Sequence, residues 1–325
     1  MSFISRRLAA AGLAVMAAVA PLAAPATAQE LPELVLTAPA GAGGGWDSLA
    51  RSLQDVMMKT GTVKSVQVVN VPGAGGTVGL AQFSQSAKGA GNQMLIGGLV
   101  MVGAIITNKS PVTLDNVTPI ARLTSDPMGV VVPKDSPIQT LADLTAKIKE
   151  DVGSTIWAGG SAGGADHILA GLITQAGGGD PAKVNYVAYS GGGEALAALL
   201  GGQVTAGISG YGEFQGQIES GDLRALAISY ANPVEGIAAQ PLKAQGVDVE
   251  MENWRGVFAG PEIADADKAA LAAAVEKAVK SPEWQEILKA RGWTDAYMGA
   301  DDFKAFVAEE NTRIGGVLKA IGLAQ

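Results

Sequence analysis

The sequence has no cysteine and a single histidine, His167, among its 325 residues. The absence of cysteine excludes disulfides, thiolate metal sites, thiol nucleophiles and lipid attachment through cysteine. One histidine cannot build a multi-histidine zinc site or a two-histidine iron site, so we expect neither a metal nor a cofactor. Basic residues are also few, with 23 Lys+Arg against 31 Asp+Glu and no cluster of them. This balance argues against nucleic acids and acidic membrane surfaces as partners.

The first 28 residues have the organisation of a cleaved export signal. Arg6-Arg7 precedes thirteen uncharged residues, 8–20, and Ala26-Thr27-Ala28 forms a small-x-small cleavage site. A membrane anchor would need about 20 apolar residues, and Pro21 interrupts the run too early. We therefore predict a signal peptide over residues 1–28, cleaved after Ala28, and a periplasmic mature protein. The paired arginines leave both the Sec and the twin-arginine export routes open.

Four short β-rich runs are each followed by a glycine-rich loop and then by the three- and four-residue apolar spacing of a helix. The runs cover residues 34–37, 66–71, 155–158 and 184–189. Strands that alternate with helices in this way are typical of βαβ units with parallel sheets covered on both faces. The sequence therefore predicts an α/β protein.

The first pair of these units is separated from the second by about eighty residues, which suggests two lobes. Strand-like runs and proline-containing loops mark where the chain changes lobe. We predict a first lobe from residues 29–124 and 229–325, and a second lobe from residues 125–228. Helices expected over 265–279, 282–290 and 301–321 should fold back onto the first lobe.

The glycine-rich loops are the best candidates for ligand binding. A helix leaves its first N–H groups unpaired, and its dipole favours negative charge at that end, so a glycine loop that enters a helix can bind an anion without a basic side chain. The alternative is that each glycine serves only a tight strand-to-helix turn. Arg51 and Arg255 are the basic residues nearest to the predicted cleft, and surface ion pairs are the alternative explanation for them.

The glycine-rich loops do not match the nucleotide-binding motifs of common enzyme classes. The sequence has no Gly-Lys pair and no G-x-G-x-x-G, which excludes the phosphate-binding loop and makes dinucleotide binding unlikely. Residues 159–163 match the G-x-S-x-G elbow of α/β hydrolases. However, the only histidine, His167, lies in the helix that this elbow would begin, whereas a triad needs a histidine well downstream. An exported serine hydrolase that uses Ser161 remains the alternative function.

Four further side chains have two readings each. Asp47 and Asp166 either face a ligand or cap the helix that each one begins. His167 either donates to a carboxylate or is satisfied within the fold. Trp46 follows three glycines at a loop-to-helix junction, where it either walls a pocket or packs in the core.

Five segments carry a resemblance to a known family. They are 39–47 (PAGAGGGWD), 70–76 (NVPGAGG), 118–123 (TPIARL), 223–228 (LRALAI) and 254–259 (WRGVFA). In these segments, which span nearly the whole mature chain, the sequence resembles the solute-binding proteins of tripartite tricarboxylate transporters, the TctC or Bug family.

The resemblance implies a two-lobed, type II periplasmic-binding-protein fold that holds its ligand in the cleft between the lobes. It also implies delivery of a small organic carboxylate to a two-component membrane permease without ATP hydrolysis, and we expect a monomer that is not an enzyme. Members of the family hold ligand carboxylate through backbone groups and ordered water. The matching positions are Gly44, Gly45, Asp47, Ala74, Gly75 and Gly76 in the first lobe, and Ser161, His167, Tyr189, Gly192 and Ser209 in the second. Trp46 completes the set of predicted ligand-binding residues.

The version of the first loop in this sequence resembles the citrate-type branch of the family. Gly43-Gly44-Gly45-Trp46-Asp47 differs from the Pro-Gly-Gly and small residues of many relatives, which favours a tricarboxylate such as citrate. Dicarboxylates and aromatic acids are the alternatives, since ligands in the family are diverse. One departure lies in residues 160–164, where a glycine replaces a hydroxyl residue of many members and removes one donor.

Overall fold

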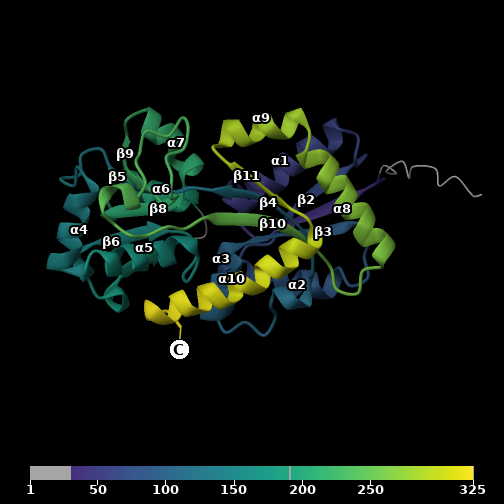
Figure 1. Ribbon diagram of the computed structural model, residues 1–325, viewed down its shortest axis with the longest axis horizontal. Helices are drawn as coiled ribbons and strands as arrows, with labels where there is room; N and C mark the ends of the chain where they lie inside the picture. Colours follow the sequence, from purple (N-terminus) through teal and green to yellow (C-terminus); the bar gives the residue numbers. More distant parts are fainter. Residues whose placement is uncertain (1–30, 190–191, 325) are drawn as a thin grey trace, which may run out of the picture.

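The computed structural model describes residues 31–189 and 192–324. The predicted signal peptide, residues 1–28, lies outside these described residues. Two β-sheets, each covered by helices, form two lobes that lie side by side (Figure 1). Within the described ranges, no helix is long and apolar enough to cross a membrane.

The first lobe is built on a six-stranded sheet with the order β11-β4-β10-β3-β1-β2. Its strands are β1 (Leu34–Ala38), β2 (Val66–Asn70), β3 (Gln93–Gly98), β4 (Thr118–Asp126), β10 (Asn253–Ala259) and β11 (Thr294–Met298). Its helices are α1 (Gly45–Lys59), α2 (Thr77–Ser86), α3 (Leu99–Thr107), α8 (Asp265–Val279), α9 (Pro282–Arg291) and α10 (Ala300–Ala320). The apolar face of α1, with Leu49, Leu53, Val56 and Met57, is fully buried, as its three- and four-residue spacing predicted.

The second lobe is built on a five-stranded sheet with the order β7-β6-β8-β5-β9. Its strands are β5 (Met128–Pro133), β6 (Ile156–Gly159), β7 (Asn185–Ala188), β8 (Ala206–Gly210) and β9 (Leu223–Ile228). Its helices are α4 (Leu141–Glu150), α5 (Ala165–Ala176), α6 (Gly192–Leu200) and α7 (Tyr211–Glu219). Thr140 and Asp143 form a capping box that fixes the start of α4.

The α/β fold with two lobes is as predicted, but the sheets are mixed rather than parallel. Strands β1, β2 and β3 are parallel, as are β6, β7 and β8. In contrast, β10 runs antiparallel to both β3 and β4, and β5 runs antiparallel to β8 and β9. Antiparallel pairing arises because the chain leaves the first lobe along β4 and returns along β10.

The chain crosses from one sheet to the other twice. Strand β4 ends at Asp126 and β5 begins at Met128, so the first passage is at Pro127. After β9, the segment 229–251 stays beside the second sheet, where Leu242 N donates to Ile228 O at 3.0 Å. The lobe boundaries at residues 125 and 229 remain a proposal.

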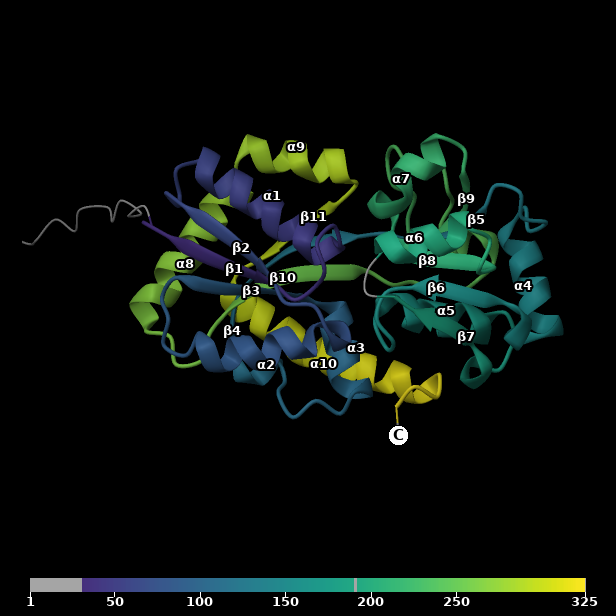
Figure 2. The ribbon, with the colours of Figure 1, turned by 180° about the vertical axis from the view of Figure 1, so that it is seen from behind.

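The C-terminal segment covers the first sheet and reaches the second lobe. Helices α8 and α10 contact β4, and β11, which the sequence pattern did not reveal, adds an edge strand. Helix α10 runs along one side of the molecule beneath both lobes (Figure 2). At its end, Ile321 packs so closely on Gly171 of α5 that a Cβ there would lie 2.8 Å from the isoleucine side chain. The C-terminal helix therefore contacts both lobes.

Candidate ligand-binding site

A cavity of about 310 Å³ lies between the lobes and is lined by residues from both of them. Its volume is at the lower end of the roughly 300–1,000 Å³ that is usual for small-molecule sites. Nine of the predicted residues line it, namely Gly44, Gly45, Trp46, Ala74, Gly75, Gly76, Ser161, Tyr189 and Ser209. Two predicted residues, Asp47 and His167, are not among the lining residues. For all twelve, contact with a ligand remains a proposal.

Four helices begin at this cavity, and each has a glycine at its N-cap. The glycines are Gly44 of α1, Gly76 of α2, Gly164 of α5 and Gly210 of α7, and none of them provides a side-chain cap. All four line the cavity. No side-chain cap uses the first N–H groups of these helices, but Thr77 N of α2 donates to Ala74 O and Tyr211 N of α7 donates to Pro127 O at 2.8 Å. The N–H groups of the first turns that have no backbone partner can bind a ligand, and the helix dipoles favour an anion there.

The two glycine loops of the first lobe fit together only because certain side chains are missing. A Cβ on Gly76 would lie 2.6 Å from the ring of Trp46, and Gly76 also has a left-handed φ of 89°. A Cβ on Gly45 would lie 2.4 Å from Nη2 of Arg255. Trp46 is 7% exposed, so it both lines the cavity and packs in the core. These glycines therefore have a packing role as well as a turn role.

Asp47 holds the first loop in place from outside the cavity lining. Its buried carboxylate accepts hydrogen bonds from Gly43 N at 2.9 Å, from Asn70 Nδ2 at 2.9 Å and from Arg51 Nε at 3.0 Å. Burial opposes ionisation of Asp47, but these bonds outweigh it and lower the pKa. Asp47 does not cap α1, since the N-cap is Gly44. We assign it a positioning role, with Arg51 as its half-exposed ion-pair partner.

The structure does not assemble a hydrolase triad around Ser161. Ser161 lines the cavity, but among the described residues no hydrogen bond joins it to His167. The imidazole of His167 instead accepts from Gly163 N at 3.1 Å through Nδ1 and stacks on Tyr186 with ring centroids 4.1 Å apart. Burial lowers the pKa of His167 to about 4. Its geometry therefore matches the reading of a histidine satisfied within the fold.

The remaining second-lobe predictions lie on three different elements. Tyr189 follows β7, and its backbone N–H donates to Gly159 O at 2.9 Å. Ser209 is the second-last residue of β8 and donates through Oγ to Glu213 at 3.0 Å. Gly192 is the first residue of α6.

A buried charged cluster at the cavity was not predicted from the sequence. Arg255 on β10 is 3% exposed and donates through Nη2 to Asp126 Oδ2 at 2.9 Å. The same nitrogen lies 3.8 Å from Glu213 Oε1 on α7 of the second lobe. The suggestion of a surface ion pair is therefore wrong for Arg255, because its partners come from distant segments that meet only in the fold. Arg255 and Glu213 line the cavity, and Asp126 lies behind them.

Burial controls the protonation of the acids in this region. It raises the pKa of Asp126 to about 7, although Arg255 acts in the opposite direction. It also raises the pKa of Asp166 to about 7 and raises that of Glu213. Across the described ranges, no group of three or more histidine, cysteine or acidic side chains is arranged to hold a metal ion.

Helix α3 supplies two lining residues that the sequence analysis missed, Val100 and Asn108 at and beyond its ends. Asn108 donates through Nδ2 to Ala74 O at 3.0 Å, which supports the second glycine loop. The sequence did contain a sign of this element, because Gly97-Gly98 separates an apolar strand from an apolar helix. The nearly uniform hydrophobicity of α3, however, gave no helical period to detect.

The chain is similar to known proteins over most of its length. Protein BugT of Bordetella pertussis is 28% identical, with 98% of each chain covered. A UPF0065 protein of Agrobacterium vitis is 27% identical over 77% of this chain and 72% of its own length.

Solved structures agree on the fold. The periplasmic binding protein BugD superposes with a TM-score of 0.79 at 23% identity, over 90% of this chain and 98% of its own. MatC of Rhodopseudomonas palustris with bound malate gives 0.80 at 23% identity, over 88% and 99%. The family model described as "Tripartite tricarboxylate transporter family receptor" matches residues 49–323. The chain therefore belongs to the receptor family of the tripartite tricarboxylate transporters, the TctC family of solute-binding proteins.

Proposed function

We propose that this receptor binds a tricarboxylate such as citrate between its lobes and delivers it to a two-component permease of a tripartite transporter. The observation that carries the proposal is the convergence of four glycine-capped helix N-termini on one cavity. Several such termini can bind several carboxylates at once without a surface lysine or arginine. The ligand contacts are then Gly44, Gly45, Trp46, Ala74, Gly75, Gly76, Ser161, Tyr189 and Ser209.

The family and the ligands of two structural relatives support the carboxylate class. MatC holds malate, and another protein of R. palustris holds adipate. Both are dicarboxylates, which are the second candidate class of ligand. An aromatic acid is the third candidate.

Calorimetric titration of the mature chain, from Gln29 onward, tests this proposal. The probes are citrate, isocitrate, tricarballylate, succinate, malate, adipate and benzoate. We expect the tricarboxylates to bind more tightly than the others. Tighter binding of a dicarboxylate or of benzoate would overturn the tricarboxylate assignment, and no binding of any acid would overturn the carboxylate class.

Replacement of one hydroxyl separates a binding site from an esterase. Ser161→Ala should weaken binding by the ~1.5–3 kcal/mol of a hydrogen bond to a charged group. Ser220→Ala is the matched control, since Ser220 is exposed and lies at the end of α7, away from the cavity lining. Hydrolysis of small esters by the parent protein, abolished in Ser161→Ala and kept in Ser220→Ala, would favour the hydrolase instead.

Export, oligomeric state and delivery need separate measurements. Mass spectrometry of the exported protein should give an N-terminus at Gln29, and light scattering should give a monomer. Uptake of labelled citrate in cells that carry the permease should require the receptor. Uptake that is unchanged without the receptor would contradict delivery.

A further inference from the structure

The cavity contains acidic side chains as well as anion-binding helix ends. Glu213 and Asp166 both line it. Both oxygens of Glu213 are engaged, since Oε2 accepts from Ser209 at 3.0 Å and Oε1 faces Arg255 at 3.8 Å. Arg255 is in turn engaged by Asp126 at 2.9 Å. Asp166 is the other acid of the lining, and it takes no part in these contacts.

Asp166 presents one oxygen without a partner. It is 8% exposed, and its Oδ2 accepts from the backbone N–H of Gly160. Among the described residues, no donor bonds to its Oδ1 and no basic side chain forms an ion pair with it. The nearby carboxyls of Glu213 and Asp126 add to the effect of burial in raising its pKa. The bond from Gly160 N gives Oδ2 a role in holding the loop. Oδ1 has no such role.

An acceptor at the wall of a cavity discriminates between ligands. An acceptor that loses its water when a ligand closes the site around it, and gains no donor, opposes binding, and a second carboxylate brought against it would be repelled. A ligand hydroxyl or ammonium group would instead donate to Oδ1. Sites built to pair with such a donor strongly reject analogues that lack it, because the buried group is then left unpaired.

We propose that Asp166 recognises a hydrogen-bond donor on the ligand, a hydroxyl or an ammonium group carried beside its carboxylates. The helix N-termini hold the carboxylates, and Asp166 selects among acids that differ only in this donor. This inference rests on the proposed carboxylate-binding function and adds to it the chemistry of a second recognition point. The carboxylate favoured by this receptor is therefore a hydroxy or amino acid rather than a plain one.

Matched ligand pairs test the inference directly. Citrate and tricarballylate share three carboxylates and differ in one hydroxyl, and malate and aspartate each add one donor to succinate. Burial raises the pKa of Asp166 to about 7, so titrations are run well above pH 7, where its ionised form prevails. We expect at least one donor-bearing acid to bind roughly tenfold or more tightly than its partner. Preference for citrate or malate assigns a hydroxyl, and preference for aspartate over succinate assigns an ammonium group.

Variants then assign the preference to Asp166. In Asp166→Asn the amide oxygen can keep the bond from Gly160 N while the NH₂ group faces the cavity, so a preference for an ammonium group should fall toward a ratio of one. A ligand hydroxyl can accept from that NH₂ group, so a preference for a hydroxyl is tested with Asp166→Ala, which offers neither donor nor acceptor. Asp180→Asn is the matched control, because exposed Asp180 also accepts a backbone N–H, from Ala182 at 3.1 Å, but far from the cavity lining. It should keep the full preference.

Each other outcome counts against the inference. Equal binding within every pair by the parent protein overturns it and leaves the carboxylate function intact, and this readout needs no variant to fold. A preference for an ammonium group that survives in Asp166→Asn, or a preference for a hydroxyl that survives in Asp166→Ala, removes Asp166 from the assignment. No binding of any of these acids defeats the inference together with the proposed function.

Discussion

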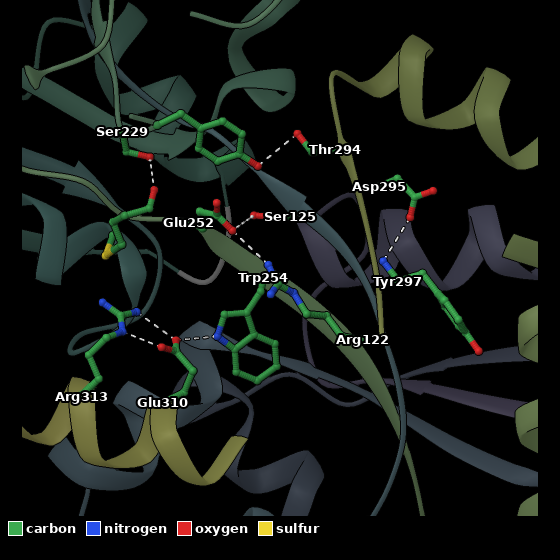
Figure 3. Close-up of polar contacts among 12 residues, drawn as sticks. Arg122, Ser125, Ser229, Glu252, Trp254, Thr294, Asp295, Tyr297, Glu310 and Arg313 are labelled. Carbon is green, nitrogen blue, oxygen red and sulfur yellow. Dashed lines mark hydrogen bonds and ion pairs between the residues drawn. The ribbon is translucent and has the colours of Figure 1, made fainter. Parts of the chain in front are cut away.

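Trp254 donates a hydrogen bond from its indole Nε1 to Glu310 Oε2 at 2.8 Å (Figure 3). The bond joins β10, on which the chain returns to the first lobe, to the long C-terminal helix α10. Both residues are buried, at 1% and 6% exposure. Arg313, one turn further along α10, donates to the same carboxylate. The start of the strand that carries Arg255 is thereby fixed to α10.

Loss of this acceptor should destabilise the fold. Glu310→Leu leaves the indole N–H of Trp254 unpaired in a buried site, which costs about 1–3 kcal/mol. Glu309→Leu is the control, since Glu309 is exposed on the same helix. Urea unfolding of the two variants should give a clear difference in the free energy of unfolding. Equal values would show that Trp254 does not depend on this bond.

Arg255 provides a second stability test, at the cavity itself. Arg255→Met leaves Asp126 without its cation in a buried site and raises the pKa of Asp126 further, so the free energy of unfolding should fall by up to about 3–5 kcal/mol, with the full loss only well above pH 7. Arg51→Met removes the same group from a half-exposed pair with Asp47 and should cost only about 0–1 kcal/mol. Urea unfolding measures the free energy of unfolding of both variants. A similar small loss in both would contradict a structural role for Arg255.

The contrast between these two arginines shows what the sequence could and could not predict. Arg51 lies four residues after Asp47, so helical spacing alone places the pair together. Arg255, in contrast, meets Asp126 across 129 residues of sequence and meets Glu213 across the gap between lobes. No local pattern encodes such a meeting, because it depends on where β4, β10 and α7 end in space.

Glycine loops were predictable for a related reason. A strand, a glycine cluster and a helical period follow one another along the chain, so the loops at Gly44, Gly76 and Gly164 could be found by inspection. Their convergence on one cavity follows from the α/β topology, in which helices begin at the carboxyl ends of strands. The antiparallel strands and β11 could not be found in this way, since strand direction depends on the passage between lobes.

Contact between the lobes can be tested at Gly45. A Cβ there would lie 2.8 Å from Glu213 Oε1 of the second lobe as well as against Arg255. Gly45→Ala should therefore hold the lobes apart and raise the Kd for the bound acid about tenfold or more, which is about 1.4 kcal/mol. Calorimetric titration measures the Kd.

Gly41→Ala is the control for this variant. A Cβ on Gly41, in the same loop, would meet nothing within 4 Å, so its Kd should equal that of the parent protein. Small-angle scattering with saturating ligand should give a larger radius for Gly45→Ala than for Gly41→Ala. Equal radii and equal affinities would mean that the lobes do not approach at this point.

His167 allows an unambiguous pH test, because it is the only histidine in the chain. Burial lowers its pKa to about 4 from the usual 6.5, so NMR signals of the imidazole should not titrate near pH 6.5. A folded-state pKa below the unfolded value gives stability that is present above pH 6.5 and is lost as the pH falls toward 4, at up to ~1.4 kcal/mol per pH unit. Asp166, whose pKa is raised, acts in the opposite direction over the same range.

A variant isolates the contribution of His167 from that of Asp166. In His167→Asn, the side-chain amide oxygen can accept from Gly163 N in place of Nδ1, but the residue cannot titrate. The free energy of unfolding of the parent protein, minus that of His167→Asn, should decrease as the pH falls from 6.5 to 4. The contributions of Asp166 are present in both proteins and cancel in the difference. A difference that is constant with pH, or an imidazole that titrates near 6.5, would mean that His167 reaches solvent and is free to act at the cavity.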